Sequence, residues 1–173
     1  MRILGHPVHP MLIVFPLGLL ATSLGFDVGY LTTGSIELAT VSFWMISAGI
    51  LGGLLSAIFG VADWWGIPSQ TRAKAIGLWH GGGNVIVVLL FIGSWLLRQA
   101  IPSHAPSSAA ITLSCFGVGL ALLTGWLGGE LVDRMGIGVD HGAHANSPNS
   151  LSGRPASEHD DSHSIGAPRS SRA

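Results

Sequence analysis

A histidine inside an apolar run is the first residue of this chain that could do chemistry. His80 lies in the segment Gly77-Leu-Trp-His-Gly-Gly-Gly-Asn84, about 6 Å beyond Ile76, where the run begins, and Asn84 follows one helical turn later on the same face. An imidazole placed there either binds a metal or cofactor or donates a hydrogen bond to a neighbouring helix carbonyl. The glycines at 81–83 leave room beside it, either for a flat ligand or for close helix contact.

Two more histidines stand near the N-terminus, each followed by a proline. His6 and His9 precede Pro7 and Pro10, which biases both histidines toward extended backbone. In polyproline II geometry, which repeats every three residues, both rings would point the same way. Together with His80 they predict imidazoles that approach one another from the first and third helices. The alternative is that His9 caps a helix that starts at a proline.

A b-type haem is one ligand that such imidazoles fit. It needs axial histidines from opposite sides, a slot lined by small residues, and basic groups near its propionates. His80 would be one axial ligand and His9 the other, with His6 as the substitute, while Arg72 and Lys74 could serve the propionates. The candidate cofactor-binding residues are His9, His80, His6, Asn84 and Arg72.

A bare metal ion such as zinc or copper is the second ligand that fits. It would need a third protein ligand beside His9 and His80, and Asp63 or Glu130 are the nearest candidates. Asp63 could instead orient His80 from behind, as carboxylates often do for metal-bound histidines. The candidate metal ligands are therefore His9, His80 and Asp63.

The elements that must position these residues are membrane-spanning helices. The chain has 173 residues, of which 48% are hydrophobic and only 10% charged, and this does not describe a soluble globule. Its uncharged runs exceed the roughly 18 residues that a bilayer core demands. We predict an all-α bundle of four transmembrane helices, at about 7–30, 37–62, 74–98 and 108–129. Residues 1–140 form this domain, and the Ser-, Gly- and His-rich residues 141–173 form a disordered tail.

Several residues predict details of the helices. Pro10 fits a first helical turn, whereas Pro16 should kink the first helix. The stretch from Asp27 to Glu37 reads as a turn. Arg98 reads as an end charge whose side chain snorkels to the membrane surface. The second helix carries small residues at helical spacing, which predicts close contact with a partner helix; they are Gly49, Gly53 and Ala57, with Gly52, Ser56 and Gly60 beside them.

The positive charges predict the orientation. Arg2, Arg72, Lys74 and Arg134 fall on the side of the two termini, and only Arg98 falls on the other side. Since positive residues stay in the cytoplasm, both termini should be cytoplasmic in a multi-pass protein of the cell membrane. Polar residues gather on the same side, which predicts one site there; they are His6, His9, Asp63, His80, Asn84, Glu130 and Asp133.

Other function classes receive little support. The net charge of −1 and the lack of a basic stripe give no reason to expect a nucleic-acid partner. No nucleophile elbow, phosphate loop or catalytic triad is recognisable. The tail histidines are weak metal signals at their spacing; they are His141, His144, His159 and His163.

Four segments of the chain resemble the DUF2231 family of small predicted membrane proteins. The residues that carry the resemblance are Gly5-His-Pro-Val-His-Pro-Met-Leu-Ile-Val-Phe-Pro-Leu-Gly18, Gly60 to Trp64, Trp79-His80 with Asn84, and Gly128-Gly-Glu-Leu-Val132 with Gly136-Ile-Gly-Val139. The resemblance covers about residues 3–140. It implies a four-helix membrane domain of uncharacterised function, similar to di-haem cytochrome b-like bundles. Some relatives carry a further histidine where this chain has Val14. Because this chain lacks it, the resemblance gives less support to two haems or to a three-histidine metal site, and His9 and His80 remain as candidate ligands.

These observations predict an integral membrane protein that binds b-type haem near the cytoplasmic face for electron transfer. It would be a redox carrier rather than an enzyme. One alternative is metal-ion binding or transport through the same histidines. Another is a non-catalytic accessory subunit that docks a partner through the small residues of the second helix. The expected partners are the lipid bilayer and either a membrane redox protein or a second copy of the chain.

Overall fold

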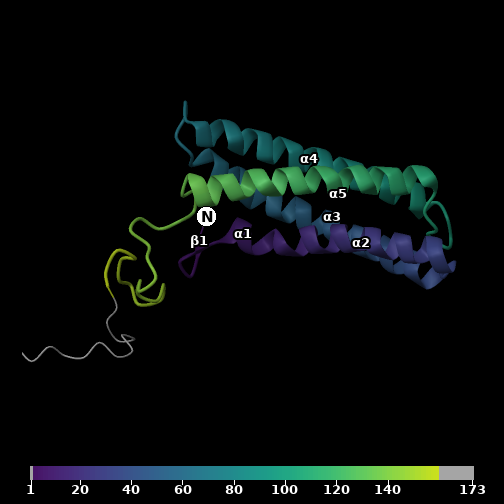
Figure 1. Ribbon diagram of the computed structural model, residues 1–173, viewed down its shortest axis with the longest axis horizontal. Helices are drawn as coiled ribbons and strands as arrows, with labels where there is room; N and C mark the ends of the chain where they lie inside the picture. Colours follow the sequence, from purple (N-terminus) through teal and green to yellow (C-terminus); the bar gives the residue numbers. More distant parts are fainter. Residues whose placement is uncertain (1, 160–173) are drawn as a thin grey trace, which may run out of the picture.

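The computed structural model describes residues 2–159 and is mostly α-helical (Figure 1). The helices are α1 (Val8–Leu12), α2 (Val14–Thr33), α3 (Ile36–Trp65), α4 (Arg72–Gln99) and α5 (Ser108–Gly129), followed by a π-helical turn, η1 (Glu130–Arg134). Two short strands, β1 (Arg2–Ile3) and β2 (His6–Pro7), pair antiparallel before α1. The four spans, Val8–Thr33, Ile36–Trp65, Arg72–Gln99 and Ser108–Arg134, are long and apolar enough to cross a membrane. The predicted all-α, four-span architecture is confirmed.

The distribution of polar residues is the reverse of that in a soluble protein. Fully buried residues include Asp27, Arg98 and several serines. Phe15, Leu51 and Trp79, by contrast, keep 67%, 69% and 74% of their surface on the outside of the bundle. Such a surface is stable in lipid, because lipid tails are as apolar as these side chains and burying them against protein brings no hydrophobic free energy.

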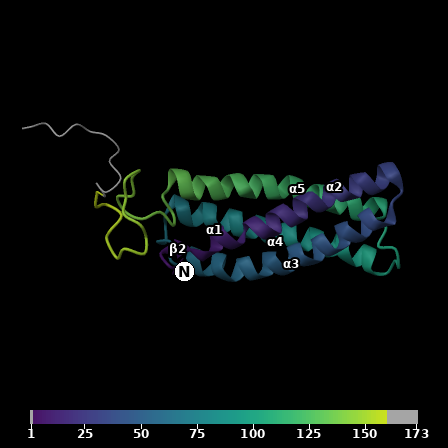
Figure 2. The same ribbon diagram turned by 90° about the horizontal axis from the view of Figure 1, so that it is seen from below.

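The bundle consists of two hairpins, which Figure 1 shows one above the other and which overlap in the view of Figure 2. The first hairpin is α1 and α2 against α3, and the second is α4 against α5; each is packed tightly within itself, and α3 and α4 join the two. Glycines permit the close approach inside each hairpin, because a Cβ on Gly49 would lie 2.6 Å from Leu20 Cδ2 and one on Gly117 would lie 2.7 Å from Phe91 Cε2. An apolar core fills the middle of the bundle, with contributions from both hairpins; its residues are Leu20, Ile46, Ile50, Val87 and Phe91.

The two ends of the bundle are different places. The terminal end holds β1, β2, the start of α1, the connection 66–71 and η1, and the loop end holds the connections 34–35 and 100–107 (Figure 1). In α4, His80 lies toward the terminal end and Arg98 at the loop end. These 18 residues span roughly 27 Å, close to the roughly 30 Å of a bilayer's hydrocarbon.

The first span departs from the prediction near its start. Helix α1 ends at Leu12, whose carbonyl Pro16 cannot bond because proline has no N–H. The turn still continues, because Ile13 N donates to His9 O at 3.1 Å and Leu17 N donates to Ile13 O at 3.1 Å. Pro10 does lie in the first turn, as predicted. The prediction that His9 is extended is wrong, because this residue is helical within α1.

The predicted turn between Asp27 and Glu37 is also wrong. Helix α2 continues to Thr33 and ends at Gly34, whose φ of 72° is the left-handed conformation that glycine favours at helix ends. Helix α3 begins at Ile36. Asp27 therefore lies inside a helix, fully buried, and not in a loop.

The segment after η1 folds back onto the N-terminal strands. Arg2 pairs with the Asp140 carboxylate and donates to Gly138 O at 2.9 Å. Residues 141–159 form turns held by local contacts such as the 3.0 Å ion pair between Arg154 and Glu158. Residues 160–173 lie outside the described part of the chain, and disorder of the tail stays a prediction.

Candidate functional site

His9 and His80 meet inside the terminal end of the bundle. His9 comes from the first hairpin and His80 from the second, and their ring centroids are 6.3 Å apart with the planes at 89°. Both rings are partly buried. Two imidazoles from different hairpins thus face the same interior, as the order of the spans predicts.

Each imidazole is held by a backbone carbonyl of its own hairpin. His9 Nδ1 lies 2.9 Å from Ser56 O, and His80 Nδ1 lies 2.8 Å from Thr124 O. Because a carbonyl oxygen only accepts, Nδ1 must carry the proton in both rings. That leaves the Nε2 lone pair of each histidine as a possible metal ligand, which is the arrangement that orients histidines in metal sites.

Asn84 and Thr124 complete the surroundings of His80. The Asn84 side-chain amide donates to His80 O at 2.9 Å and approaches His80 Nε2 at 3.3 Å. Thr124 Oγ1 in turn donates to Asn84 Oδ1 at 3.1 Å. The Asn84 side chain is therefore fixed by two bonds that do not involve the His80 ring, and the longer contact to Nε2 is the weakest of the three.

Two glycines form the walls against which the rings lie. A Cβ on Gly60 would come 3.0 Å from His9 Cε1, and a Cβ on Gly128 would come 3.0 Å from His80 Cε1. The glycines at 81–83 have other places. Gly81 and Gly82 face open space, and a Cβ on Gly83 would overlap the Thr124 methyl group. Residues 81–83 therefore serve helix contact only through Gly83, and the room beside each ring comes from a different helix.

The other predicted cofactor ligands lie away from this pair. His6 is exposed in β2, and its Nδ1 lies 3.1 Å from Leu4 O. Arg72 is 71% exposed and forms a 3.4 Å ion pair with Glu130, so both side chains are engaged at the surface of the second hairpin. The expectation that His6 and His9 point the same way is wrong, because only His9 enters the bundle.

The predicted metal set does not assemble as a group. Among residues 2–159, no three or more His, Cys, Asp or Glu side chains are arranged to hold a metal ion. Asp63 is partly buried near the end of α3. In the tail, the His144 and His159 rings stack at 5.4 Å, and His163 lies outside the described residues.

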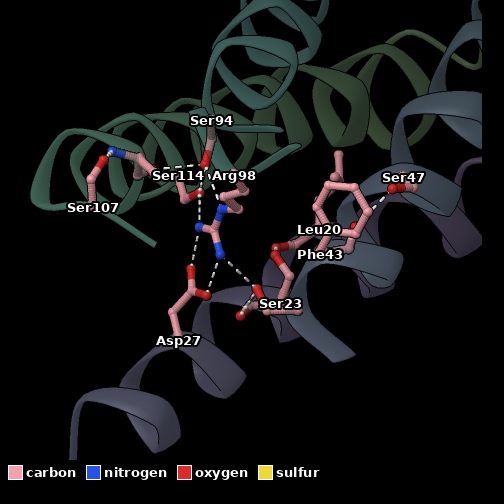
Figure 3. Close-up of polar contacts among 11 residues, drawn as sticks. Leu20, Ser23, Asp27, Phe43, Ser47, Ser94, Arg98, Ser107 and Ser114 are labelled. Carbon is pink, nitrogen blue, oxygen red and sulfur yellow. Dashed lines mark hydrogen bonds and ion pairs between the residues drawn. The ribbon is translucent and has the colours of Figure 1, made fainter. Parts of the chain in front are cut away.

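The loop end contains a buried ion pair that was not predicted from the sequence (Figure 3). Arg98 of α4 donates through both terminal nitrogens to the two oxygens of Asp27 of α2, each at 2.6 Å. Both side chains have no exposed surface. The interpretation of Arg98 as a snorkelling end charge is therefore wrong: its guanidinium points into the bundle because a carboxylate there compensates it.

Serines from three helices satisfy the remaining guanidinium donors. Arg98 Nε donates to Ser94 Oγ at 3.2 Å, and the terminal nitrogens also donate to Ser42 Oγ at 3.2 Å and Ser114 Oγ at 3.3 Å (Figure 3). With the two bonds to Asp27, all five N–H groups of the guanidinium have an acceptor. One residue or more from each of the four spans takes part, so the network ties the two hairpins together.

Aromatic rings lie beside this network at the loop end. The His104 ring stacks on Phe43 at 3.9 Å, and Phe43 stacks on Trp95 at 5.7 Å. The Trp95 indole donates to Ser47 Oγ at 2.8 Å, from α4 to α3. The contacts of Trp95 with Phe43 and Ser47 add a second connection between the hairpins.

The small residues of α3 are used inside the chain. A Cβ on Gly52 would lie 3.4 Å from Pro16 Cδ, and one on Gly53 would lie 3.3 Å from Val88 Cγ2. These two glycines therefore contact α2 and α4, whereas Ala57 of the same predicted surface is exposed. Docking of a separate partner stays a prediction.

Comparison with known proteins gives a family. Residues 5–141 match the family described as "Predicted membrane protein (DUF2231)". A search of curated proteins and a search of solved structures each found no match. The match covers more than half of the chain, and all four spans lie within it. The chain belongs to the DUF2231 family of predicted membrane proteins.

Proposed function

We propose that this protein is a membrane electron carrier that binds a b-type haem, with His9 and His80 as the axial ligands. The observation that carries the proposal is the pair itself. Two imidazoles come from different hairpins with centroids 6.3 Å apart, and each is anchored through Nδ1 on a backbone carbonyl. Both therefore keep Nε2 for a ligand.

The number of donors favours haem over a bare ion. Zinc sites take three or four ligands from the protein, and no such group occurs within residues 2–159. A haem brings four nitrogens of its own and takes only axial ligands from the protein. The observed set of two imidazoles fits that demand.

The surroundings of the two rings also favour ligation by both histidines. The wall glycines, Gly60 and Gly128, keep each ring close to a helix backbone. Asn84 gives up only its 3.3 Å contact when His80 Nε2 is used, since its bonds to His80 O and Thr124 remain.

The protein's own residues would orient and shield the ligand. The Ser56 and Thr124 carbonyls fix the planes of the two rings, and the apolar core separates the site from the loop end. A bound haem would supply one-electron redox chemistry, tuned by its axial ligands and their hydrogen bonds. With the termini in the cytoplasm of a cell-membrane protein, as the positive charges predict, electrons would enter and leave on that face.

Absorption spectra of the detergent-purified protein, oxidised and reduced, together with elemental analysis, test the proposal. We expect a haem spectrum that is lost in His80→Ala and in His9→Ala. His6→Ala is the matched control, because His6 is exposed on the strand β2 and its loss should leave the spectrum unchanged.

Three outcomes would contradict haem ligation by this pair. One is a redox spectrum that is indifferent to His80→Ala. Another is a folded protein that holds no haem and takes up none when haemin is added. The third is a stoichiometric metal without a Soret band, which would favour the bare-ion alternative, and then Asp63→Ala should weaken retention of that metal.

A further inference from the structure

The buried residues of α2 have counterparts in α4 at a constant spacing. Asp27 and Arg98 are 71 positions apart, as are His9 and His80. The same spacing relates every buried residue of α2 to a buried residue of α4: Pro16 to Val87, Leu20 to Phe91, Ser23 to Ser94, and Asp27 to Arg98.

The second and fourth spans correspond in the same way, at a spacing of 68 positions. Every buried residue of α5 has a buried counterpart in α3. The pairs are Ser42 with Ala110, Ile46 with Ser114, Gly49 with Gly117, and Ser56 with Thr124. Because the spacing differs by only three between the two sets, the two hairpins have nearly the same length and register.

Contacts inside the hairpins correspond as well. Gly49 receives Leu20 as Gly117 receives Phe91, with hypothetical Cβ distances of 2.6 and 2.7 Å. At the loop end, Ser42 Oγ donates to Ser23 O at 3.0 Å, and Ser94 Oγ donates to Ala110 O at 2.8 Å. The same two positions are thus bonded in both hairpins, although the donor has moved to the other helix.

The terminal end repeats the same pattern. His9 binds Ser56 O and lies against Gly60, four residues later in α3. His80 binds Thr124 O and lies against Gly128, four residues later in α5. A shared pattern of histidine, carbonyl and glycine is hard to obtain from two unrelated hairpins.

We infer that the bundle is two copies of one helical-hairpin unit arranged about a twofold axis, and that Asp27 and Arg98 select the pairing of unlike units. Equivalent residues touch each other only on the axis of an isologous interface. His9 touches His80 near one end and Asp27 touches Arg98 at the other, so both contacts lie on that axis. The inference does not depend on what the histidines bind.

The opposite charges decide which units associate. Two first units would bury two carboxylates against each other, and two second units would bury two guanidinium groups. An unpaired charge in a membrane interior is strongly unfavourable, so both like pairings are rejected. The fully bonded network forms only in a pair that contains one first unit and one second unit. The two units can come from one chain or from two copies that exchange hairpins.

The repeat also accounts for an unsatisfied hydroxyl. Ser56 Oγ is the one buried side-chain nitrogen or oxygen within residues 2–159 that has no hydrogen-bond partner. Its counterpart, Thr124, donates to Asn84 Oδ1. The position equivalent to Asn84 in the first unit, 71 residues earlier, is Ile13, which has no acceptor.

Charge reversal in the full chain tests the pairing role. Asp27→Arg alone and Arg98→Asp alone each bury two like charges and should abolish the folded, monodisperse species in detergent. The double reversal should recover most of that species, because Ser23 precedes position 27 by one turn as Ser94 precedes Arg98, and offers the same acceptor for Nε. A double reversal that accumulates but is as unfolded as either single variant would overturn the inference.

A second variant tests the equivalence without touching the ion pair. Ile13→Asn should give Ser56 the acceptor that Asn84 gives Thr124, and its unfolding midpoint should match or exceed that of the parent. Val14→Asn is the control, because Val14 is 62% exposed on the outer surface and an amide there should lower the midpoint. Equal losses in both variants would overturn the equivalence, and this comparison decides alone if the double reversal does not accumulate.

Discussion

The two ends of the bundle each hold a buried polar pair, but they differ in what the pair leaves unused. At the loop end, Arg98 places all five guanidinium N–H groups on acceptors, and the pair closes on itself. At the terminal end, His9 and His80 each use Nδ1 and keep Nε2. Buried polar groups therefore form two kinds of network here: a fully satisfied one at the loop end, and a partly satisfied one at the terminal end that we propose binds haem.

Removing one partner of the ion pair should have the largest effect. Arg98→Ala leaves the Asp27 carboxylate buried without compensation, which should lower the free energy of unfolding by about 3 to 5 kcal/mol. Reversible unfolding in mixed detergent micelles would measure the change. The control is Asp27→Leu combined with Arg98→Met, which removes both charges and should cost far less. Equal losses of unfolding free energy in the single and double variants would mean that the charges of the two side chains contribute less to stability than their packing.

Closing the glycine contact between α4 and α5 should have the next largest effect. Gly83→Ala places a methyl group into Thr124, and such overpacking typically costs about 1 to 3 kcal/mol. Gly82→Ala is the matched control one residue away, where nothing lies within 4 Å. The same unfolding measurement should separate the two variants, and the prediction fails if Gly82→Ala is equally destabilised.

Substitution in the histidine pair should affect the proposed haem binding more than the free energy of unfolding. His9→Ala removes one hydrogen bond to Ser56 O and some packing, which should cost about 1 to 2 kcal/mol. The same variant should lose the proposed haem entirely. If His9→Ala lost as much stability as we expect for Arg98→Ala, the two ends would not differ as described.

The smallest effect is expected for the second contact between the hairpins at the loop end. Ser47→Ala removes the hydroxyl that accepts the Trp95 indole N–H at 2.8 Å. Hydrogen bonds between membrane helices contribute about 0.6 kcal/mol on average, so the unfolding midpoint should shift only slightly. A loss comparable to that of Arg98→Ala would show that the aromatic contacts, and not the ion pair, hold this end together.

The spans were predictable because the bilayer imposes a length and a composition that can be counted along the chain. Their order also brings His9 and His80 to the same end, since successive spans must alternate in direction. The positions of the spans do not determine how each helix is rotated about its axis, and so they do not show which residues face the interior of the bundle. The sequence therefore allows His6 as a substitute for His9 as ligand, although only His9 faces the interior.

The ion pair was missed for a different reason. Arg98 stands at the end of an apolar run, where most arginines reach the membrane surface, and Asp27 stands 71 residues away. The signal that could have found it is the repeated spacing of a histidine, a serine and a charge. It occurs as His9, Ser23, Asp27 and again as His80, Ser94, Arg98.

Roughly 27 Å of helix between His80 and Arg98 would separate the proposed haem from the loop end of the bundle. The apolar core, the closed ion-pair network and the aromatic rings of the loop end lie between the histidines and the opposite end of the bundle. A carrier built this way would take its electron and return it on the same side, so it would shuttle between partners along the membrane plane rather than conduct across it.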